Sequence, residues 1–161
     1  MPDETNTSSK IACPSCSRTL TPLAVGRIVV DACHQGCGGI WFDYFELQRF
    51  DEVHEGEGKM LANVERAEGV QPDQEKRLRC PRCSDVVLRR HFFSVNQKVV
   101  VDSCPGCGGY WLDHGELALI RSEFPTAQAR DRAAERFVDD HVSAFGSQGY
   151  HHCICEGSYP I

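Results

Sequence analysis

One cysteine pattern occurs twice in this chain of 161 residues, and it constrains the fold more than any other feature. In each copy a Cys-Pro-x-Cys turn is followed, after a stretch rich in β-branched residues, by a second close pair of cysteines. Two such pairs supply the four soft ligands that zinc prefers, because each tight turn directs both sulfurs to one side. The pattern therefore predicts two zinc ions per chain, one in each four-cysteine site. The eight cysteines are Cys13, Cys16, Cys33, Cys37, Cys80, Cys83, Cys104 and Cys107.

The two predicted sites are not identical. Cys33-His-Gln-Gly-Cys37 has one residue more between its cysteines than Cys104-Pro-Gly-Cys107. This insertion makes His34 an alternative ligand, although four cysteines remain the prediction for the first site. Iron is the alternative metal, since Cys-Pro-Gly-Cys-Gly also resembles a rubredoxin knuckle, but a cytoplasmic structural role favours zinc. The Cys-x-x-Cys pairs also resemble thioredoxin motifs, whose strand-to-helix context in an α/β unit is absent here.

Local patterns around the cysteines predict a small, metal-stabilised α+β fold. Residues 19–25 and 27–32 form an expected hairpin, as do residues 86–95 and 98–103. A third short strand should follow each Gly-Gly, over residues 40–42 and 110–112. Each repeat thus predicts a zinc ribbon of three antiparallel strands with a trailing helix, and the chain adds a C-terminal helix.

Composition divides the chain into six predicted segments. Each cysteine block is too short for a hydrophobic core to suffice, so two separate modules held by metal are expected. The segments are a disordered tail (1–10), zinc ribbon 1 with its trailing helix (11–50), an acidic and partly helical connector (51–77), zinc ribbon 2 with its trailing helix (78–122), a C-terminal helix (123–145) and a flexible His/Cys tail (146–161).

The trailing helices are predicted from two capping boxes. Asp43 is followed three residues later by Glu46, and Asp113 by Glu116. In a capping box the first side chain accepts from the amide three residues on, and the glutamate reaches back. A helix should therefore begin after each aspartate, and a further helical run is expected over residues 61–68.

Other residues at repeated positions have structural explanations. Trp41 and Trp111 are interpreted as packing the third strand against the following helix, in preference to stacking on a ligand. The acidic residues at repeated positions lie beside a knuckle or in a cap, which explains them without catalysis. No further histidine or acid is spaced to leave zinc an open position, so we expect no enzymatic activity. These acids are Asp31, Asp102, Glu46 and Glu116.

Charge is uneven along the chain. The formal net charge is -6, and each filled four-cysteine site would add about two negative charges. Basic residues nevertheless gather at the start of the second ribbon, where Phe92 and Phe93 are available for stacking. The same cluster is also what a solvated hairpin looks like. The candidate nucleic-acid-binding residues are Lys76, Arg77, Arg79, Arg82, Arg89 and Arg90.

The C-terminal tail carries four more metal-ligating side chains within five residues. They would form a third, weak site for a thiophilic metal, or they belong to a terminus without fixed geometry. The four residues are His151, His152, Cys153 and Cys155.

Two further patterns indicate the cellular compartment of the protein. The first ten residues lack the basic region and apolar run of a signal peptide, and no apolar run approaches the roughly 20 residues that span a membrane. Paired thiols that bind metal suit a reducing compartment. We therefore expect a cytoplasmic protein that does not enter a membrane.

The second repeat also resembles a known family. Residues 99–117 read Val-Val-Val-Asp-Ser-Cys-Pro-Gly-Cys-Gly-Gly-Tyr-Trp-Leu-Asp-His-Gly-Glu-Leu. This string resembles the bacterial zinc ribbons of the transcription factor IIB zinc-finger type, with Cys-Pro-x-Cys before it and Asp-x-Cys-x-x-Cys-Gly-Gly-x-Trp-x-Asp-x-x-Glu-Leu as the hallmark. The first repeat departs from it in its longer knuckle and in Tyr44-Phe45, where small or polar residues are usual. The resemblance covers about residues 11–50 and 78–120.

The resemblance implies zinc binding and, by analogy of fold, a role in transcription. The leading hypothesis is a non-enzymatic adaptor whose two ribbons bind a protein partner that the sequence does not identify. The alternative is a nucleic-acid-binding module that acts through the basic second ribbon. A third hypothesis, a metal or redox sensor, depends on Cys153 and Cys155 in the tail. The sequence assigns no oligomeric state.

Overall fold

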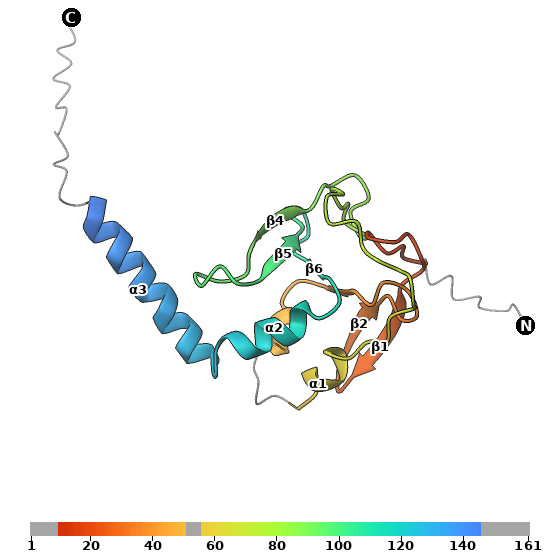
Figure 1. Ribbon diagram of the computed structural model, residues 1–161, viewed down its shortest axis with the longest axis horizontal. Coiled ribbons are helices and arrows are strands. Elements are labelled where there is room, and N and C mark those ends of the chain that lie inside the picture. The colour runs from red at the N-terminus through yellow and green to blue at the C-terminus, as the bar shows by residue number, and fades with distance from the viewer. Residues whose placement is uncertain (1–9, 51–55, 146–161) are drawn as a thin grey trace, which may run out of the picture.

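The computed structural model describes residues 10–50 and 56–145, with side chains as far as residue 140. It has the predicted α+β character, and the third strands begin and end where the sequence places them. In chain order the elements are β1 (Thr21–Val25), β2 (Ile28–Ala32), β3 (Ile40–Phe42), the 3-10 turn η1 (Leu47–Arg49), α1 (Gly58–Leu61), β4 (Arg89–Phe92), β5 (Val100–Ser103), β6 (Tyr110–Leu112), α2 (Glu116–Glu123) and α3 (Ala127–Phe145) (Figure 1).

The two ribbons share a single antiparallel sheet. Its strand order is β1-β2-β3-β6-β5-β4, so the third strands of the two repeats pair with each other at the centre. Trp41 lies directly opposite Trp111 in this pairing, and the repeats are related by an approximate twofold axis between them. The sequence suggests two separate modules, whereas this pairing joins them and leaves only β1 and β4 at the edges of the sheet.

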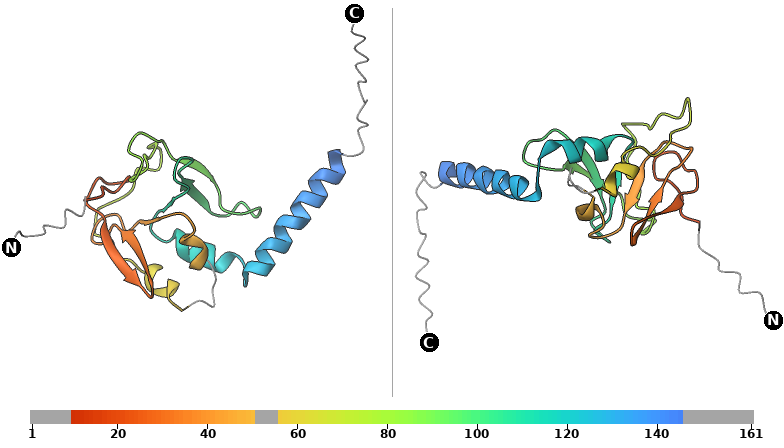
Figure 2. Two further views of the ribbon diagram at one scale, coloured as in Figure 1. Left: turned by 180° about the vertical axis from the view of Figure 1, so that it is seen from behind. Right: turned by 90° about the horizontal axis from the view of Figure 1, so that it is seen from below.

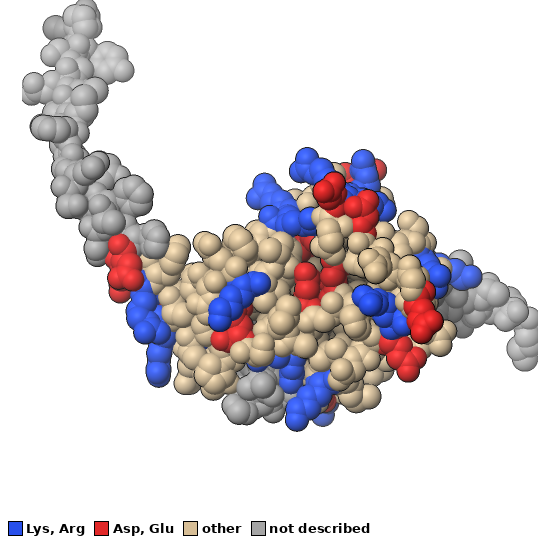
Figure 3. Space-filling view, in the orientation of Figure 1, with Lys and Arg blue, Asp and Glu red and all other residues tan. Residues whose placement is uncertain are grey.

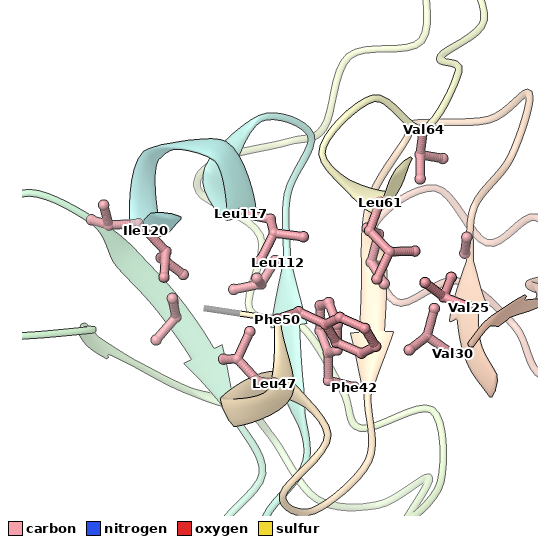
Figure 4. Packing of buried hydrophobic residues seen from close by; sticks show 14 residues of the cluster. Val25, Val30, Phe42, Leu47, Phe50, Leu61, Val64, Leu112, Leu117 and Ile120 are labelled. Carbon is pink, nitrogen blue, oxygen red and sulfur yellow. The ribbon is translucent and has the colours of Figure 1, made fainter. Parts of the chain in front are cut away.

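One face of the sheet carries a core that both repeats build. Figure 4 shows Phe42 and Phe50 at its centre, between Leu61 of α1 and Leu117 of α2. The two phenylalanine rings are fully buried, and their centroids are 6.0 Å apart. Because one apolar cluster runs through both repeats, removing either repeat would expose the core of the other.

The opposite face of the sheet carries a second core made of cysteines, leucines and the two tryptophans. Trp41 and Trp111 are fully buried there, because side chains alternate between faces along a strand. The expectation that they pack against the trailing helices is therefore wrong. A Cβ atom on Gly39 would lie 2.2 Å from the Trp111 ring, and one on Gly109 would lie 2.2 Å from the Trp41 ring. Each indole thus occupies space that only a glycine in the other repeat leaves open.

The tryptophans also explain why the predicted aspartate caps do not form. Glu116 Oε2 accepts from the Asp113 amide at 2.7 Å, so the glutamate half of the capping box is present. The Asp113 carboxylate, however, accepts from Nε1 of Trp111 at 3.0 Å, and no side chain caps α2. A buried indole N–H needs an acceptor, and this aspartate provides it. The first repeat has the same two bonds, at 2.7 and 2.8 Å, among Asp43, Glu46 and Trp41.

Two predicted helices differ from the structure. In the first repeat the trailing helix is reduced to the single turn η1, whereas the second repeat forms the eight-residue α2. The predicted helix over 61–68 is also wrong, since α1 ends at Leu61. The segment after α1 pairs instead with the first knuckle, through a bridge between Gly36 and Arg66. Backbone groups that would continue the helix are used in this pairing.

The C-terminal helix forms as predicted but starts at Ala127, after an extended Phe124. It projects away from the sheet in every view (Figures 1 and 2). Within the described residues, no helix combines the length and apolar character that crossing a bilayer requires.

Candidate metal centres

The eight cysteines gather into two clusters, as the sequence predicts. The sulfurs of Cys13, Cys16, Cys33 and Cys37 all lie within 4.8 Å of one another, and so do those of Cys80, Cys83, Cys104 and Cys107. Individual Sγ–Sγ distances are 3.5 Å for Cys13–Cys37, 3.4 Å for Cys16–Cys33 and 3.6 Å for Cys80–Cys107. A tetrahedron with zinc–sulfur bonds of about 2.3 Å has edges of about 3.8 Å, whereas a disulfide bond is about 2.05 Å long. The two clusters therefore fit two zinc ions.

Backbone amides around the second cluster favour the thiolate form that binds metal. The Cys83 amide lies 3.2 Å from Cys80 Sγ, and the Cys107 amide lies 3.4 Å from Cys104 Sγ. Burial raises the pKa of Cys104, but the amides of Cys107 and Gly106, together with the neighbouring Cys80 and Cys107 thiols, outweigh it and lower that pKa to about 7. Burial also raises the pKa of Cys80 above its usual range. A bound cation would offset this cost of burying thiolate charge.

The extra residue of the first knuckle binds the connector. Gln35 has a left-handed backbone, with φ of 54°, and its amide donates to the Glu65 carbonyl at 3.0 Å. Arg18 Nη1 donates to the Gln35 carbonyl at 2.6 Å. His34 lies on the surface with Nε2 3.5 Å from a Glu65 carboxylate oxygen, outside the cysteine cluster. The insertion thus anchors the connector, and His34 does not replace a cysteine.

The second knuckle of each repeat contacts a side chain from the other repeat. Tyr44 lies directly over Gly108 of the second knuckle, and His114 lies over Gly38 of the first. Together with the two tryptophans, which pack in the same buried cluster as the cysteines, these residues place the interface between the repeats beside both metal sites.

The four acids at repeated positions have structural partners. Arg82 Nη2 donates to Asp31 at 2.7 Å, and Arg90 Nε donates to Asp102 at 3.4 Å. Burial raises the pKa of both aspartates, and the two guanidinium groups oppose that rise. Burial also raises the pKa of Glu116, to about 7, against the lowering effect of the Asp113 amide.

Two of the six candidate nucleic-acid-binding residues are used inside the molecule. Arg82 also donates to both carboxylate oxygens of Asp43, at 3.1 and 2.8 Å, so it joins the second repeat to the first. Arg90 Nη1 donates to the Gln74 carbonyl at 2.5 Å, in addition to Asp102. Arg79 lies 3.5 Å from the Asp85 carbonyl and outside the groove described next.

The remaining three candidates line one groove along the edge strand β4. This basic groove has a volume of about 800 Å³, and its charged or titratable lining consists of Glu75, Lys76, Arg77, Arg89, Arg90, His91 and Asp102. Its two carboxylates partly offset the cations, and acidic and basic side chains lie side by side at this end of the molecule (Figure 3). Phe92, predicted to be available for stacking, is 48% exposed, whereas Phe93 is half-buried beneath the Arg130 guanidinium.

Sequence reasoning missed a second hollow, which lies beside the junction of the repeats. This aromatic hollow has a volume of about 410 Å³ and is lined by Tyr44, Phe45, Leu47, Gln48, Phe93, Ser103, Cys104, Gly108, Tyr110 and Arg130. Tyr44 and Phe45 are 62% and 56% exposed, and their ring centroids are 3.8 Å apart. Phe45 has φ of 69°, and the equivalent residue of the second repeat is Gly115, with φ of 88°. The signal was present in the sequence, as a phenylalanine aligned with a glycine.

The tail residues His151, His152, Cys153 and Cys155 lie outside the described residues. The third metal site stays a prediction.

Comparison with known proteins supports the assignment of the metal sites. The family described as "Transcription factor zinc-finger" matches residues 12–51 and 79–121, once on each repeat. These two segments make up just over half of the chain. Searches of curated proteins and of solved structures find no match.

Proposed function

This chain belongs to the transcription factor zinc-finger family through both of its repeats, and we propose that it is a non-enzymatic adaptor that binds a protein partner at the aromatic hollow. Each metal site offers four cysteines, which fill the coordination shell of a structural zinc and leave no position for a substrate. The zinc ions stabilise the individual ribbons, and the surface where the two ribbons meet binds the partner.

The observation that carries this proposal is the backbone of Phe45. A bulky residue in the left-handed region costs roughly 1–3 kcal/mol, and burial does not repay that cost here because the ring is 56% exposed. Glycine at this position would avoid the strain, as Gly115 does in the second repeat. Strained residues that expose an aromatic ring are typical of binding sites, since the ring gains its burial only when the partner is bound.

The chemistry of the hollow suits a protein partner. Tyr44, Phe45 and Tyr110 present aromatic surface, and Arg130 provides the hollow with a guanidinium group. Aromatic residues and arginine are the side chains most enriched at the centres of protein interfaces. The net charge of -6 repels phosphate backbones, which further favours protein over nucleic acid.

Affinity capture from the native cell extract tests the proposal. Zinc-loaded wild-type chain should retain defined proteins after nuclease treatment, and Phe45→Gly should lose them while its circular dichroism stays native. Met60→Ala is the matched control, because Met60 is an apolar side chain 69% exposed on α1, away from the hollow. RNA polymerase subunits among the captured proteins would support a role in transcription. Undiminished capture by Phe45→Gly would refute the proposal.

The basic groove favours a second candidate function, the binding of nucleic acid. Lys76, Arg77 and Arg89 point to this alternative, because all three line one groove along an edge strand. Binding of single-stranded nucleic acid should weaken steeply with salt, and Arg77→Ser with Arg89→Ser should flatten that dependence. Arg90 is left unchanged because it holds Asp102. Salt-insensitive or absent binding would exclude this function.

A further inference from the structure

The two edge strands of the sheet, β1 and β4, offer different backbone groups to a further strand (Figure 1). Just before β1, the Leu20 amide donates to the Ile11 carbonyl at 2.7 Å, on the side away from β2. Backbone groups alternate in direction along a strand, so the next residue to face outward is Pro22. Proline has no N–H, and it blocks pairing at the edge of a sheet. The β1 edge is therefore poorly suited to strand addition.

The β4 edge has no proline. Phe93 donates to the Val99 carbonyl at 2.8 Å, on the inner side, and Leu88 donates to the Leu78 carbonyl at 2.9 Å, on the outer side. By the same alternation, the even-numbered residues of β4 direct their N–H and C=O groups away from the sheet.

These outward groups belong to Arg90 and Phe92. Within the part of the chain that the structure describes, no hydrogen bond reaches the N–H or C=O of Arg90 or the N–H of Phe92. The Phe92 carbonyl lies 2.9 Å from Nδ1 of the neighbouring His91. All four residues of β4 are exposed, so this edge is accessible. A strand added here would satisfy backbone groups that now depend on water.

The basic groove runs along this edge, between β4 and residues 75–78. Arg90 and Asp102 lie 3.4 Å apart in an ion pair, so their charges offset each other. The rest of the charged lining consists of three cations and one acid, which gives the groove a positive balance and attracts an acidic partner. These four residues are Lys76, Arg77, Arg89 and Glu75.

We propose that β4 binds an extended acidic segment of another protein, which pairs with it as an added antiparallel strand. Every strand pair of the sheet is antiparallel, and antiparallel pairing is the more stable kind. Arg89 and His91 lie on one face of β4, and Arg90 and Phe92 lie on the other. Residues directly opposite each other share a face, so acidic side chains of the segment meet Arg89 and apolar ones meet Phe92. The segment therefore alternates acidic and apolar residues.

A polypeptide fits this edge better than the other occupants do. It supplies a donor and an acceptor at each paired residue, whereas a DNA backbone offers acceptors only and would leave the Arg90 carbonyl unpaired. Pairing of β4 with β4 of a second copy would bring cations of both chains together, which destabilises a strand pair. The edge and its charge thus favour an acidic peptide.

Fluorescence anisotropy with a labelled peptide tests the proposal. The probe is Glu-Val-Glu-Val-Glu-Val-Glu with both termini blocked, and the zinc-loaded full chain should bind it with a dissociation constant below about 1 mM. A peptide with lysine in place of glutamate should bind at least about tenfold more weakly, because the groove repels it. Equal binding of the two peptides overturns the proposal. Binding of single-stranded DNA without binding of the acidic peptide overturns it too and assigns the edge to nucleic acid.

Methylation of the peptide backbone separates strand pairing from simple attraction between charges. In the antiparallel arrangement the valines lie opposite Arg90 and Phe92 and direct their N–H groups at β4, whereas the glutamate N–H groups point away. N-methylation of the valines should therefore abolish binding, and N-methylation of the glutamates should preserve it. Equal effects of the two modifications overturn the proposal, as does a larger loss from methylated glutamates.

Variants of the protein locate the site. Arg89→Glu should raise the dissociation constant of the acidic peptide at least about tenfold. Arg27→Glu is the matched control, because it makes the same change in net charge on the exposed turn between β1 and β2. Phe45→Gly should leave peptide binding unchanged, so failure of this proposal and failure of the aromatic hollow can be distinguished. Peptide binding that Arg89→Glu and Arg27→Glu reduce equally overturns the proposal.

Discussion

The two repeats hold the same buried aspartate by different means. Asp102 is directly opposite Arg90 of its own hairpin, which supplies the guanidinium that it needs. Asp31 is directly opposite Pro22, which has no donor, and it takes Arg82 from the other repeat instead. Where the second repeat has Arg82, the first has Ser15, a buried residue whose hydroxyl has no hydrogen-bond partner within the described part of the chain. The second repeat therefore supplies the cation for its own buried aspartate, whereas the first repeat takes that cation from the second.

The elements that follow the third strands also differ, and again the second repeat supports the first. The second repeat has the helix α2, whose Leu117 and Ile120 close the shared core. The first repeat has one turn, and its end at Phe50 is held by Arg121, a buried side chain of α2 that donates to the Phe50 carbonyl at 2.6 Å. In both comparisons a side chain of the second repeat supports the first, and the first repeat carries the strained, exposed Phe45.

Among the changes considered, loss of one metal ligand should destabilise the two repeats most. Cys104→Ser removes a ligand of the second site, and we expect both zinc ions to be lost, because the knuckles pack across the repeat junction. Structural zinc in small ribbons contributes on the order of 10 kcal/mol to folding. Native mass spectrometry and circular dichroism check the outcome. A folded chain that retains one zinc ion would show that the repeats are independent.

A methyl group at the repeat junction should have the next largest effect. Gly39→Ala and Gly109→Ala each push a methyl group into the indole of the other repeat, and we expect each to destabilise the chain by about 3 kcal/mol. Denaturant titration measures the loss. Gly56→Ala is the control, since a methyl group there meets no atom within 4 Å. Unequal losses at Gly39 and Gly109 would show where the twofold relation between the repeats fails.

Replacement of Arg82, which the second repeat provides to Asp31 of the first, should destabilise the chain less than a methyl group at the repeat junction. Arg82→Ala leaves the buried Asp31 without a cation, and we expect a loss of about 1–2 kcal/mol, limited because the guanidinium is 39% exposed. Asp31→Asn in the same chain should recover much of the stability, as measured by thermal unfolding. If Asp31→Asn gives no recovery, the dependence of the first repeat on Arg82 is not electrostatic.

The smallest expected effect is a gain in stability. Phe45→Gly gives the first repeat the residue of the second at a left-handed position, and we expect stabilisation of about 1 kcal/mol from the release of backbone strain. Denaturant midpoints measure the change. A loss of stability would mean that the Phe45 ring supports the fold, and it would remove the argument for a binding role.

The sequence predicts well what depends on neighbouring residues. The spacing of the cysteines locates both metal sites, and the apolar stretches before and after the knuckles locate all three strands of each ribbon. The choice of Asp43 and Asp113 as helix caps fails because each carboxylate has a competing donor, an indole that a local rule does not include.

The sequence does not predict what depends on distant pairing. Strands β3 and β6 have three residues each. The sequence around them does not indicate whether the outer edge of such a strand pairs with another strand or faces solvent. The same pairing places Tyr44 and Phe45 beside Tyr110 and Phe93, so the aromatic hollow exists only after the repeats have met. The aligned pair Phe45 and Gly115 was the one available sign, because a residue that replaces glycine at a turn has to adopt a left-handed backbone.

The central pairing of β3 with β6 is brief, with three residues from each strand. Covalent linkage makes their encounter an event within one molecule, at an effective concentration in the millimolar range for a short linker. Two separate ribbons at micromolar concentration would be about 1,000-fold below this effective concentration, and a contact this short would dissociate on dilution. The connector therefore does more than span two modules, because its length sets the local concentration at which this sheet becomes continuous.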